Sequence, residues 1–284
     1  MACVSLNELP IRSDGSVRPS GLALPPAAMP LVHDRRPLKR WIYAGVYGDE
    51  LMLCAATVRV GGIPHSFWAV LDRSSGELLE QTAFSPRMVA IANGRLSVKS
   101  RRAKIDIALR PNGEPVEVVS RHGASYIWTR KLPITASGTI HAAGRVQRVE
   151  ASGLVDATAG YHARDTAWNW SAGVGAAADG SALAWNIVSG VHDAPTASER
   201  TLWVDGAARE LPPAEFPADL AGVDFPDSDC SLAFSAEAER ANSEDLKIFA
   251  SEYSQPFGTF AGTFPGGVEL ASGFGVMERH SARW

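Results

Sequence analysis

The sequence predicts an all-β protein made of two tandem antiparallel β-barrels or sandwiches. Apolar and polar residues alternate with a period of two through most of the chain, as in half-buried strands. Turn-forming pairs such as Asn93-Gly94 and Asn112-Gly113 interrupt the alternation. Stretches with the 3.6-residue period of a helix are nearly absent. One open sheet seldom exceeds ~10 strands, so the roughly 16–19 strands expected here fit two barrels or sandwiches better.

Residues 1–36 are expected to form a proline-rich arm. Proline removes a backbone donor and fixes φ, so the arm should be extended and irregular, and its few apolar residues could dock on a sheet edge. The first lobe is expected over residues 37–140 and the second lobe, which carries the candidate site, over residues 141–284. The boundary falls near Gly138–Gly144, where turn residues gather.

Strands are assigned where β-branched and aromatic residues lie between turn formers. In the first lobe Trp41, Tyr43 and Tyr47 share one face of a strand. Further strands are expected at 51–60, 65–72, 103–109, 116–120 and 125–130, and then at 138–142, 145–150, 153–164, 166–177, 182–191, 200–205, 230–238, 244–253, 257–264 and 268–281. Residues 211–229 should form a long loop or one short helix, and residues 236–246 are the best helical candidate.

Composition excludes several classes of protein. The chain has 284 residues and a formal net charge of -4, so no basic field would draw it onto nucleic acid or an anionic membrane. No apolar run approaches the ~18–20 residues of a membrane-spanning helix. Cys3, Cys54 and Cys230 are scattered, which suits a reducing cytoplasm and fits no metal motif. We expect a cytoplasmic monomer or weak dimer.

The first candidate site segment is residues 161–171. If it is one strand, His162, Arg164, Trp168 and Trp170 share a face. Bulky aromatic rings with interspersed polar groups are what the wall of a ligand cavity requires. The alternative is a packed core in which both tryptophans fill a barrel and Arg164 pairs with an acid such as Asp156.

The second segment contains Asn186 and His192, which have the same parity. Histidine titrates near neutrality and a carboxylate can orient it. Sequence neighbours on a strand point to opposite faces, however, so His192 and Asp193 could form a dyad only in a turn. The alternative is a polar strand end with turn-capping hydrogen bonds.

The third segment is the C-terminal region, with Tyr253, Glu278 and His280. Glu278 and His280 share a face with Phe274 and Val276. A carboxyl group among apolar side chains would have a raised pKa and could donate a proton, or it could pair with Arg164. The alternatives are a solvent-facing strand end and an internal salt bridge. A zinc site from His162, His192, His280 and Glu278 has only weak support.

Several long motifs resemble one uncharacterised bacterial family of unknown function. They are YHARDTAWNWSAGVG, AWNIVSGVHD, SERTLWVDG, SEYSQPFGTFAGTFPGG and GFGVMERHSARW, with KRWIYAGVYGDELMLCAATVRVG and SYIWTRK in the first half. The resemblance spans residues 36–284. That family is more distantly similar to two-lobed lipocalin-like (calycin) proteins, namely carotenoid 1,2-hydratases (hydroxyneurosporene synthases), tocopherol cyclases and polyene pericyclases.

The distant similarity implies tandem calycin-type barrels with an apolar cavity in which acids and aromatic rings act on an isoprenoid or polyene. Tyr161, His162, Asp165 and Glu278 match such residues in kind. The hypothesis is a hydrophobic small-molecule site near the lobe interface, with Glu278 or Asp165 as the acid and His162 as a relay. Arg164 would anchor a carbonyl or carboxylate, while Trp168 and Trp170 would stabilise positive charge.

The sequence carries no nucleotide-binding glycine motif, no nucleophile elbow and no HExxH motif. We therefore expect no cofactor and no metal. A carrier that binds a lipid or pigment without changing it remains an alternative to the enzyme, as does an interaction module with a closed core.

Overall fold

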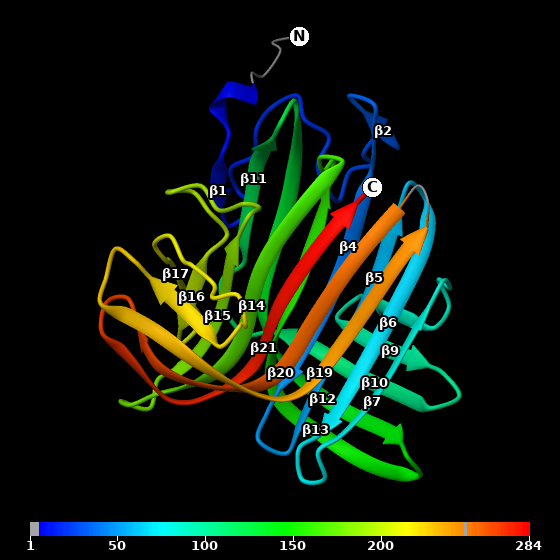
Figure 1. The fold of residues 1–284 in the computed structure, drawn as a ribbon, viewed down its shortest axis with the longest axis vertical. Helices are drawn as coiled ribbons and strands as arrows, with labels where there is room; N and C mark the ends of the chain where they lie inside the picture. The colour runs from blue at the N-terminus through cyan, green and yellow to red at the C-terminus, as the bar shows by residue number, and fades with distance from the viewer. Residues whose placement is uncertain (1–5, 247–248) are drawn as a thin grey trace.

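The computed structural model describes residues 6–246 and 249–284 and is almost entirely β (Figure 1). The strands are β1 (Ile11–Ser13), β2 (Val32–His33), β3 (Arg36–Pro37), β4 (Lys39–Tyr47), β5 (Leu51–Val60), β6 (Ile63–Asp72), β7 (Glu77–Ala83), β8 (Val89–Ala92), β9 (Arg95–Lys99), β10 (Ala103–Pro111), β11 (Val116–His122), β12 (Ser125–Ala142), β13 (Arg145–Gly160), β14 (Asp165–Ala177), β15 (Ala182–Ser189), β16 (Thr201–Val204), β17 (Ala207–Glu210), β18 (Gly222–Phe225), β19 (Cys230–Leu246), β20 (Phe249–Phe264) and β21 (Val268–Arg283). The predicted all-β class is confirmed: two large antiparallel sheets are curled into half-barrels.

The first sheet has eleven strands, with the main order β7-β6-β5-β4-β13-β12-β10-β9-β8; β11 pairs with β12 and with β1. It curls until β8 lies against β5. The enclosed core contains Trp68, Leu96 and Ile107, all fully buried. Curling buries one face of the sheet against itself, and the other face is left to pack elsewhere.

The second sheet has eight strands in the order β17-β16-β15-β14-β21-β20-β19-β18. Register shifts between Ala176 and Ala177, within β19 and within β20 bend its long strands. Its own core contains Trp185, which stands edge-on to the Phe260 ring at a centroid distance of 5.0 Å. The remaining faces of the two sheets form a shared core that includes Tyr43, Trp170 and Phe257.

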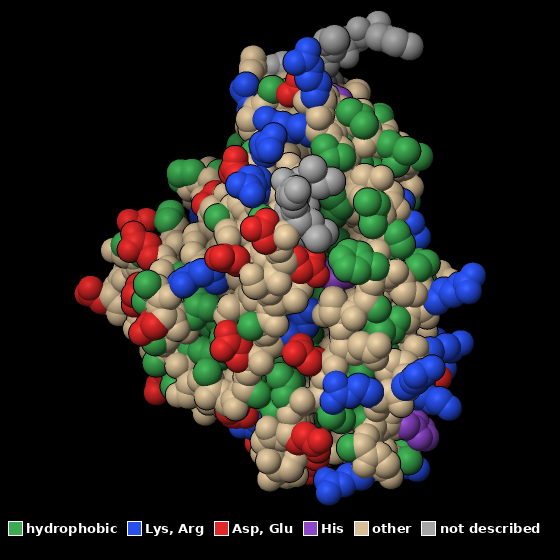
Figure 2. All heavy atoms as spheres, turned by 45° about the vertical axis from the view of Figure 1, so that its right-hand side comes forward, with side chains coloured by type: hydrophobic (Ala, Val, Ile, Leu, Met, Phe, Trp, Pro, Cys, Tyr) green, Lys and Arg blue, Asp and Glu red, His purple; other side chains and the backbone are tan. Residues whose placement is uncertain are grey.

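Ion pairs join the two sheets at their junction. Arg73 Nη2 lies 2.6 Å from Glu237 Oε1, and Arg240 Nε lies 3.2 Å from Glu80 Oε2. Basic side chains outnumber acidic ones in residues 37–160, and the reverse holds in residues 161–284. Figure 2 shows Lys and Arg side chains gathered at the lower right, and many of the Asp and Glu side chains further left. The two halves therefore attract one another, which complements their apolar contact.

The N-terminal arm lies over one end of the molecule (Figure 1). Its β1 strand pairs with β11, and the Tyr161 hydroxyl donates a hydrogen bond of 2.7 Å to the carbonyl oxygen of Pro30. Arg12 reaches the second sheet and donates to Thr201 Oγ1 at 2.9 Å. The arm therefore contacts both sheets.

The structure divides the chain later than the predicted lobe boundary at residue 140. Strand β13 pairs with β4 and β12, so the first sheet continues to Gly160 and the second begins at Asp165. A boundary at 140 would separate β13 from both neighbours. The division into two β-barrel lobes stays a prediction.

The helical assignment of residues 236–246 was wrong, because these residues belong to β19. Small and charged residues alternate there, and a bulge between Ala236 and Ala238 shifts the period. Residues 211–229 form a long connection that includes the short strand β18. The described residues contain one 3-10 turn, Leu6–Glu8, and none of their helices is long and apolar enough to cross a membrane.

A substitution at Gly173 would test the packing of the second sheet. This glycine lies opposite Trp185 on β15, and a Cβ atom at Gly173 would lie 2.1 Å from Trp185 Cζ2. We expect Gly173→Ala to lower the free energy of unfolding by about 1–3 kcal/mol, because a fully buried indole would have to move. Chemical denaturation would measure this. Gly48→Ala is the control, since its Cβ would meet no atom closer than 3.5 Å. Equal stabilities for the two variants would contradict the packing.

Candidate functional site

A cavity of about 400 Å³ lies between the two sheets. Its walls come from both: the first sheet contributes Trp41, Tyr43 and Phe67, and the second contributes Trp168 and Trp170. The cavity thus lies where the two sheets meet, and the first sheet contributes to it as well as the second. A largely aromatic cavity of this size, with a few polar groups, is typical of small-molecule sites.

The register of the second sheet places four candidate residues on one wall. Trp168 lies directly opposite His280, and Trp170 lies directly opposite Glu278, across the β14–β21 pair. Residues opposite one another share a face of the sheet. Tyr253 on β20 extends the row, since it lies opposite His280. The parity predicted within each segment therefore holds for Trp168, Trp170, Glu278 and His280, and pairing joins the segments.

Glu278 is held at both carboxylate oxygens. Trp168 Nε1 donates to Oε1 at 2.8 Å, and Gln255 Nε2 donates to Oε2 at 2.9 Å. The side chain is buried, with 8% of its surface exposed, and none of the ion pairs among the described residues includes it. The predicted pairing with Arg164 is absent.

Burial dominates the titration of Glu278. Loss of solvation raises its pKa from 4.5 to about 7, although the hydrogen bond from Trp168 acts in the opposite direction. A carboxylic acid with this pKa is divided between its two protonation states at neutral pH. It can therefore give or accept a proton under physiological conditions.

His280 and Tyr253 are neutral neighbours of Glu278. The His280 ring lies against Trp168 at a centroid distance of 4.3 Å, and His280 Nε2 is 2.8 Å from Ser251 Oγ. Burial and nearby Arg240 lower the pKa of His280 to about 3. Burial, followed by the charge of Glu278, raises the pKa of Tyr253 well above its ordinary value. These groups therefore act near pH 7 as uncharged hydrogen-bonding partners.

His162 and His192 lie on another wall of the cavity. Both are buried, and burial lowers both pKa values, that of His192 to about 3. His192 Nδ1 is 2.7 Å from Ser120 Oγ. His192 Nε2 and His162 Nδ1 have no hydrogen-bond partner among the described residues. His192 has a positive φ of 51° in the turn after β15, so Asp193 instead caps the turn by accepting from the Gly190 amide.

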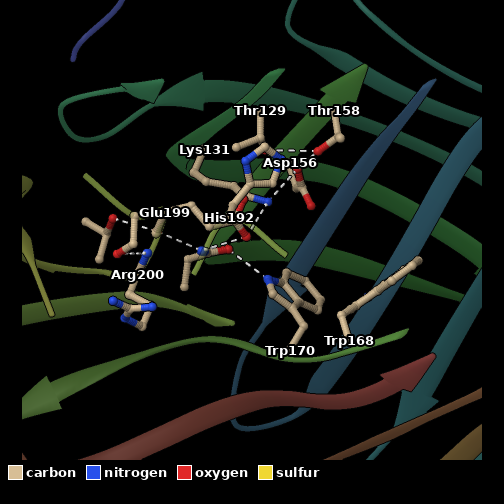
Figure 3. A network of polar contacts seen from close by, with 12 residues as sticks. Thr129, Lys131, Asp156, Thr158, Trp168, Trp170, His192, Glu199 and Arg200 are labelled. Atoms are coloured by element: carbon tan, nitrogen blue, oxygen red, sulfur yellow. Dashed lines mark hydrogen bonds and ion pairs between the residues drawn. The ribbon is translucent and has the colours of Figure 1, made fainter. Parts of the chain in front are cut away.

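A buried ion triad completes this wall. Lys131 Nζ lies 2.7 Å from Asp156 Oδ1 and 3.2 Å from Glu199 Oε1, and all three side chains line the cavity (Figure 3). Burial would lower the pKa of Lys131, but the two carboxylates together raise it, so the ammonium stays charged. The triad therefore presents no unpaired cation.

Asn186 connects the triad to the aromatic wall. Trp170 Nε1 donates to Asn186 Oδ1 at 2.7 Å, and Asn186 Nδ2 donates to the Glu199 carbonyl oxygen at 3.0 Å. Asn186 itself does not line the cavity. Its position behind Trp170 makes it a support for the wall.

Tyr161, Arg164 and Asp165 lie outside the cavity lining. Strand β13 ends at Gly160 and β14 begins at Asp165, so residues 161–164 are not on a strand and the expected alternation stops there. Arg164 and Asp165 are exposed, and Tyr161 is buried in a separate cluster beneath the N-terminal arm. His162 reaches the cavity from this irregular segment.

Sequence reasoning missed Lys131 and Arg240 as site residues and treated Asp156 only as a pairing partner. It considered Glu199 only beside His192 and Asp193, for acid–base chemistry. Lys131 and Asp156 lie directly opposite one another on β12 and β13. Asp156 is the one charged residue among the small, apolar and hydroxylated residues 151–160, which is a signal that could have found it. Lys131 directly follows Arg130, so no such signal marks it. Their convergence depends on pairing between strands, which no single segment reveals.

The arrangement supports proton transfer in an apolar, aromatic environment. No cluster of His, Cys, Asp and Glu that could hold a metal ion occurs within residues 6–246 and 249–284. Glu278 supplies the exchangeable proton, and the faces of the surrounding tryptophan rings attract positive charge.

Comparisons with known proteins show the family and the fold. A family model described as a domain of unknown function, DUF2804, matches residues 87–284. No curated protein matches the sequence. A crystal structure of a Nitrosomonas europaea protein, provisionally assigned as AttH, is similar with a TM-score of 0.51 and 14% identity over 91% of this chain and 98% of that chain. Kievitone hydratase from Nectria haematococca is similar with a TM-score of 0.50 and 12% identity over 85% of this chain and 88% of that chain. At these identities the likeness shows a shared lipocalin-like fold.

Glu278 makes protein stability depend on pH. Its pKa is about 7 in the folded state against an ordinary 4.5, so the folded state holds the proton more tightly than the unfolded state. The free energy of unfolding should therefore fall as pH rises through this window. Gln cannot ionise, so the free energy of unfolding of Glu278→Gln should exceed that of wild type by about 3 kcal/mol at pH 8 and by almost nothing at pH 4. The size follows because one pKa unit corresponds to about 1.4 kcal/mol. The Gln255 amide can turn its unpartnered Oε1 toward the new amide.

Denaturant melts across pH would measure this difference. Glu150→Gln is the matched control, because Glu150 is exposed on β13 and its removal should leave the wild-type pH profile intact. A constant difference between Glu278→Gln and wild type at all pH values would contradict the raised pKa.

Proposed function

We propose that this chain, which belongs to the DUF2804 family of unknown function, binds an apolar or amphipathic small molecule between its two sheets and acts on it by proton transfer. Glu278 is the observation that carries this proposal. A carboxyl group with a pKa near 7 beside tryptophan rings is costly for a purely structural role.

The reaction that these groups suit is cofactor-free hydration, isomerisation or cyclisation of an isoprenoid or polyene-like molecule. In hydration, the Glu278 carboxylic acid gives its proton to one carbon of a double bond, and the other carbon becomes positively charged. Trp168 and Trp170 stabilise that charge through their ring faces, each by ~0.5–2 kcal/mol. Water adds to the cation, and the proton lost from this water returns to the Glu278 carboxylate.

The supporting groups have positioning roles in this proposal. Gln255 and Trp168 fix the carboxyl group by hydrogen bonds to both oxygens. His162 and His192 are uncharged and would orient the ligand by hydrogen bonding rather than relay a proton, because their pKa values are lowered. Arg164 and Asp165 have no part, since both side chains are exposed away from the cavity.

Native mass spectrometry of the freshly purified protein, followed by solvent extraction, should identify an apolar adduct. That ligand should then be consumed by wild type and not by Glu278→Gln, which should still bind it. Activity should fall as pH rises above about 7, because the acid form of Glu278 disappears. Asp165→Asn is the matched control and should keep wild-type activity.

The outcomes separate the rival functions. A ligand that is bound by wild type and Glu278→Gln and recovered unchanged from both would make the protein a carrier. Wild-type turnover by Glu278→Gln would remove the catalytic role. A protein that binds nothing after exposure to lipid and isoprenoid extracts would contradict the binding site itself.

A further inference from the structure

We infer that the ligand of this cavity is electrically neutral, an alcohol, phenol or ketone rather than a carboxylate or phosphate. This inference rests on the proposed function and defines its substrate class. It follows from how the cations around the cavity are paired and from which polar atoms are left without partners.

Two cations line the cavity in the described part of the chain, and carboxylates neutralise both. Lys131 lies between Asp156 and Glu199, at 2.7 and 3.2 Å. Arg240, which is 2% exposed, contacts Glu80 at 3.2 Å and donates to Thr82 Oγ1 at 2.8 Å. An anionic ligand would have to enter an apolar space without a free counter-charge, which is strongly unfavourable.

Aromatic rings also occupy the faces of Arg240. Its guanidinium carbon lies 3.9 Å from the Phe67 ring centroid and 4.9 Å from that of Tyr253. With Glu80 beside Nε, Thr82 at Nη2 and rings over its faces, the guanidinium is already engaged where a carboxylate or phosphate would bind two of its nitrogens. The sequence hypothesis gave such an anchoring role to Arg164, which is exposed.

Lys39 is a nearby cation that does not line the cavity. Its Nζ donates to the His162 carbonyl oxygen at 3.1 Å and lies 4.7 Å from the Trp284 ring centroid. Burial and the neighbouring Arg36 lower its pKa to about 8, so its charge is already costly in this position. Trp284 lines the cavity but Lys39 does not, so Lys39 makes no direct contact with a ligand.

The unpartnered polar atoms suit a neutral head group. His162 Nδ1 and His192 Nε2 are buried without partners, and their residues line the cavity at 1% and 7% exposure. Neither nitrogen has accessible surface, so each ring would have to turn toward the cavity to bond a ligand. A neutral imidazole nitrogen can match a hydroxyl or carbonyl oxygen without leaving a buried charge.

The test compares two probes with the same apolar chain, farnesol and farnesoic acid, in calorimetric binding titrations at pH 8. Wild type should bind farnesol at least about tenfold more tightly than farnesoate. This preference is smaller than the full cost of burying an unpaired charge would produce. Glu80→Gln releases Arg240 from its carboxylate and should reduce this ratio by tightening farnesoate binding. Glu80 is partly exposed, with 37% of its side chain accessible, so the variant should fold.

Asp106→Asn is the matched control. It breaks the exposed ion pair with Arg95, far from the cavity lining, and should leave the farnesol-to-farnesoate ratio unchanged. The double variant Asp156→Asn with Glu199→Gln is a second test, because it leaves Lys131 without a counter-charge and should favour farnesoate further.

The results separate this inference from the function on which it rests. Equal or tighter binding of farnesoate by wild type would overturn the neutral-ligand inference while the binding site stands. An unchanged ratio in Glu80→Gln and in the folded double variant would also overturn it. Failure of wild type to bind either probe or any extracted lipid would instead refute the proposed function.

Discussion

The site depends on the register of two curled sheets that meet face to face. In the first sheet, the register aligns one cross-strand row that contains Lys131, Asp156, Tyr43 and Phe67. In the second sheet it sets Trp170 opposite Glu278. A slip by one residue in either sheet would turn these side chains to the opposite face. The pleat therefore fixes which polar groups are buried together in the shared core.

Burial then gives the polar groups different roles. Lys131 keeps its charge because two carboxylates contact it, and the triad is electrostatically satisfied. His192 and His280 lose their charge because loss of solvation is the largest effect on each, and for His192 it outweighs the attraction of Asp156 and Asp193. Glu278 receives two neutral donors and no cation among the described ion pairs, so its proton is lost near neutral pH. One wall is thus fixed in charge while the other can exchange a proton.

The sequence predicted the fold class and much of one wall, because both depend on local alternation. The shared faces of Trp168 with Trp170, and of Glu278 with His280, followed from the two-residue period. The opposite wall could not be predicted, since Lys131 meets Glu199 only through pairing among distant strands and the packing of the sheets. The position of Arg164 was mistaken for a different reason: the chain leaves its strand at residues 161–164, and nothing in the alternation marks that break. Asp165 begins β14 with the opposite parity to Trp168 and Trp170, so the two-residue period itself places it on the other face.

The central claim is that Glu278 exchanges its proton near neutral pH inside an aromatic cavity. Infrared titration of the ligand-free protein tests it most directly, with the protonated-carboxyl band of Glu278 isolated by subtracting the spectrum of Glu278→Gln. The structure predicts that this band disappears with a midpoint at pH about 7. A midpoint near the ordinary value of 4.5 would show a solvated carboxylate, and would contradict both the buried site and the proton transfer assigned to it.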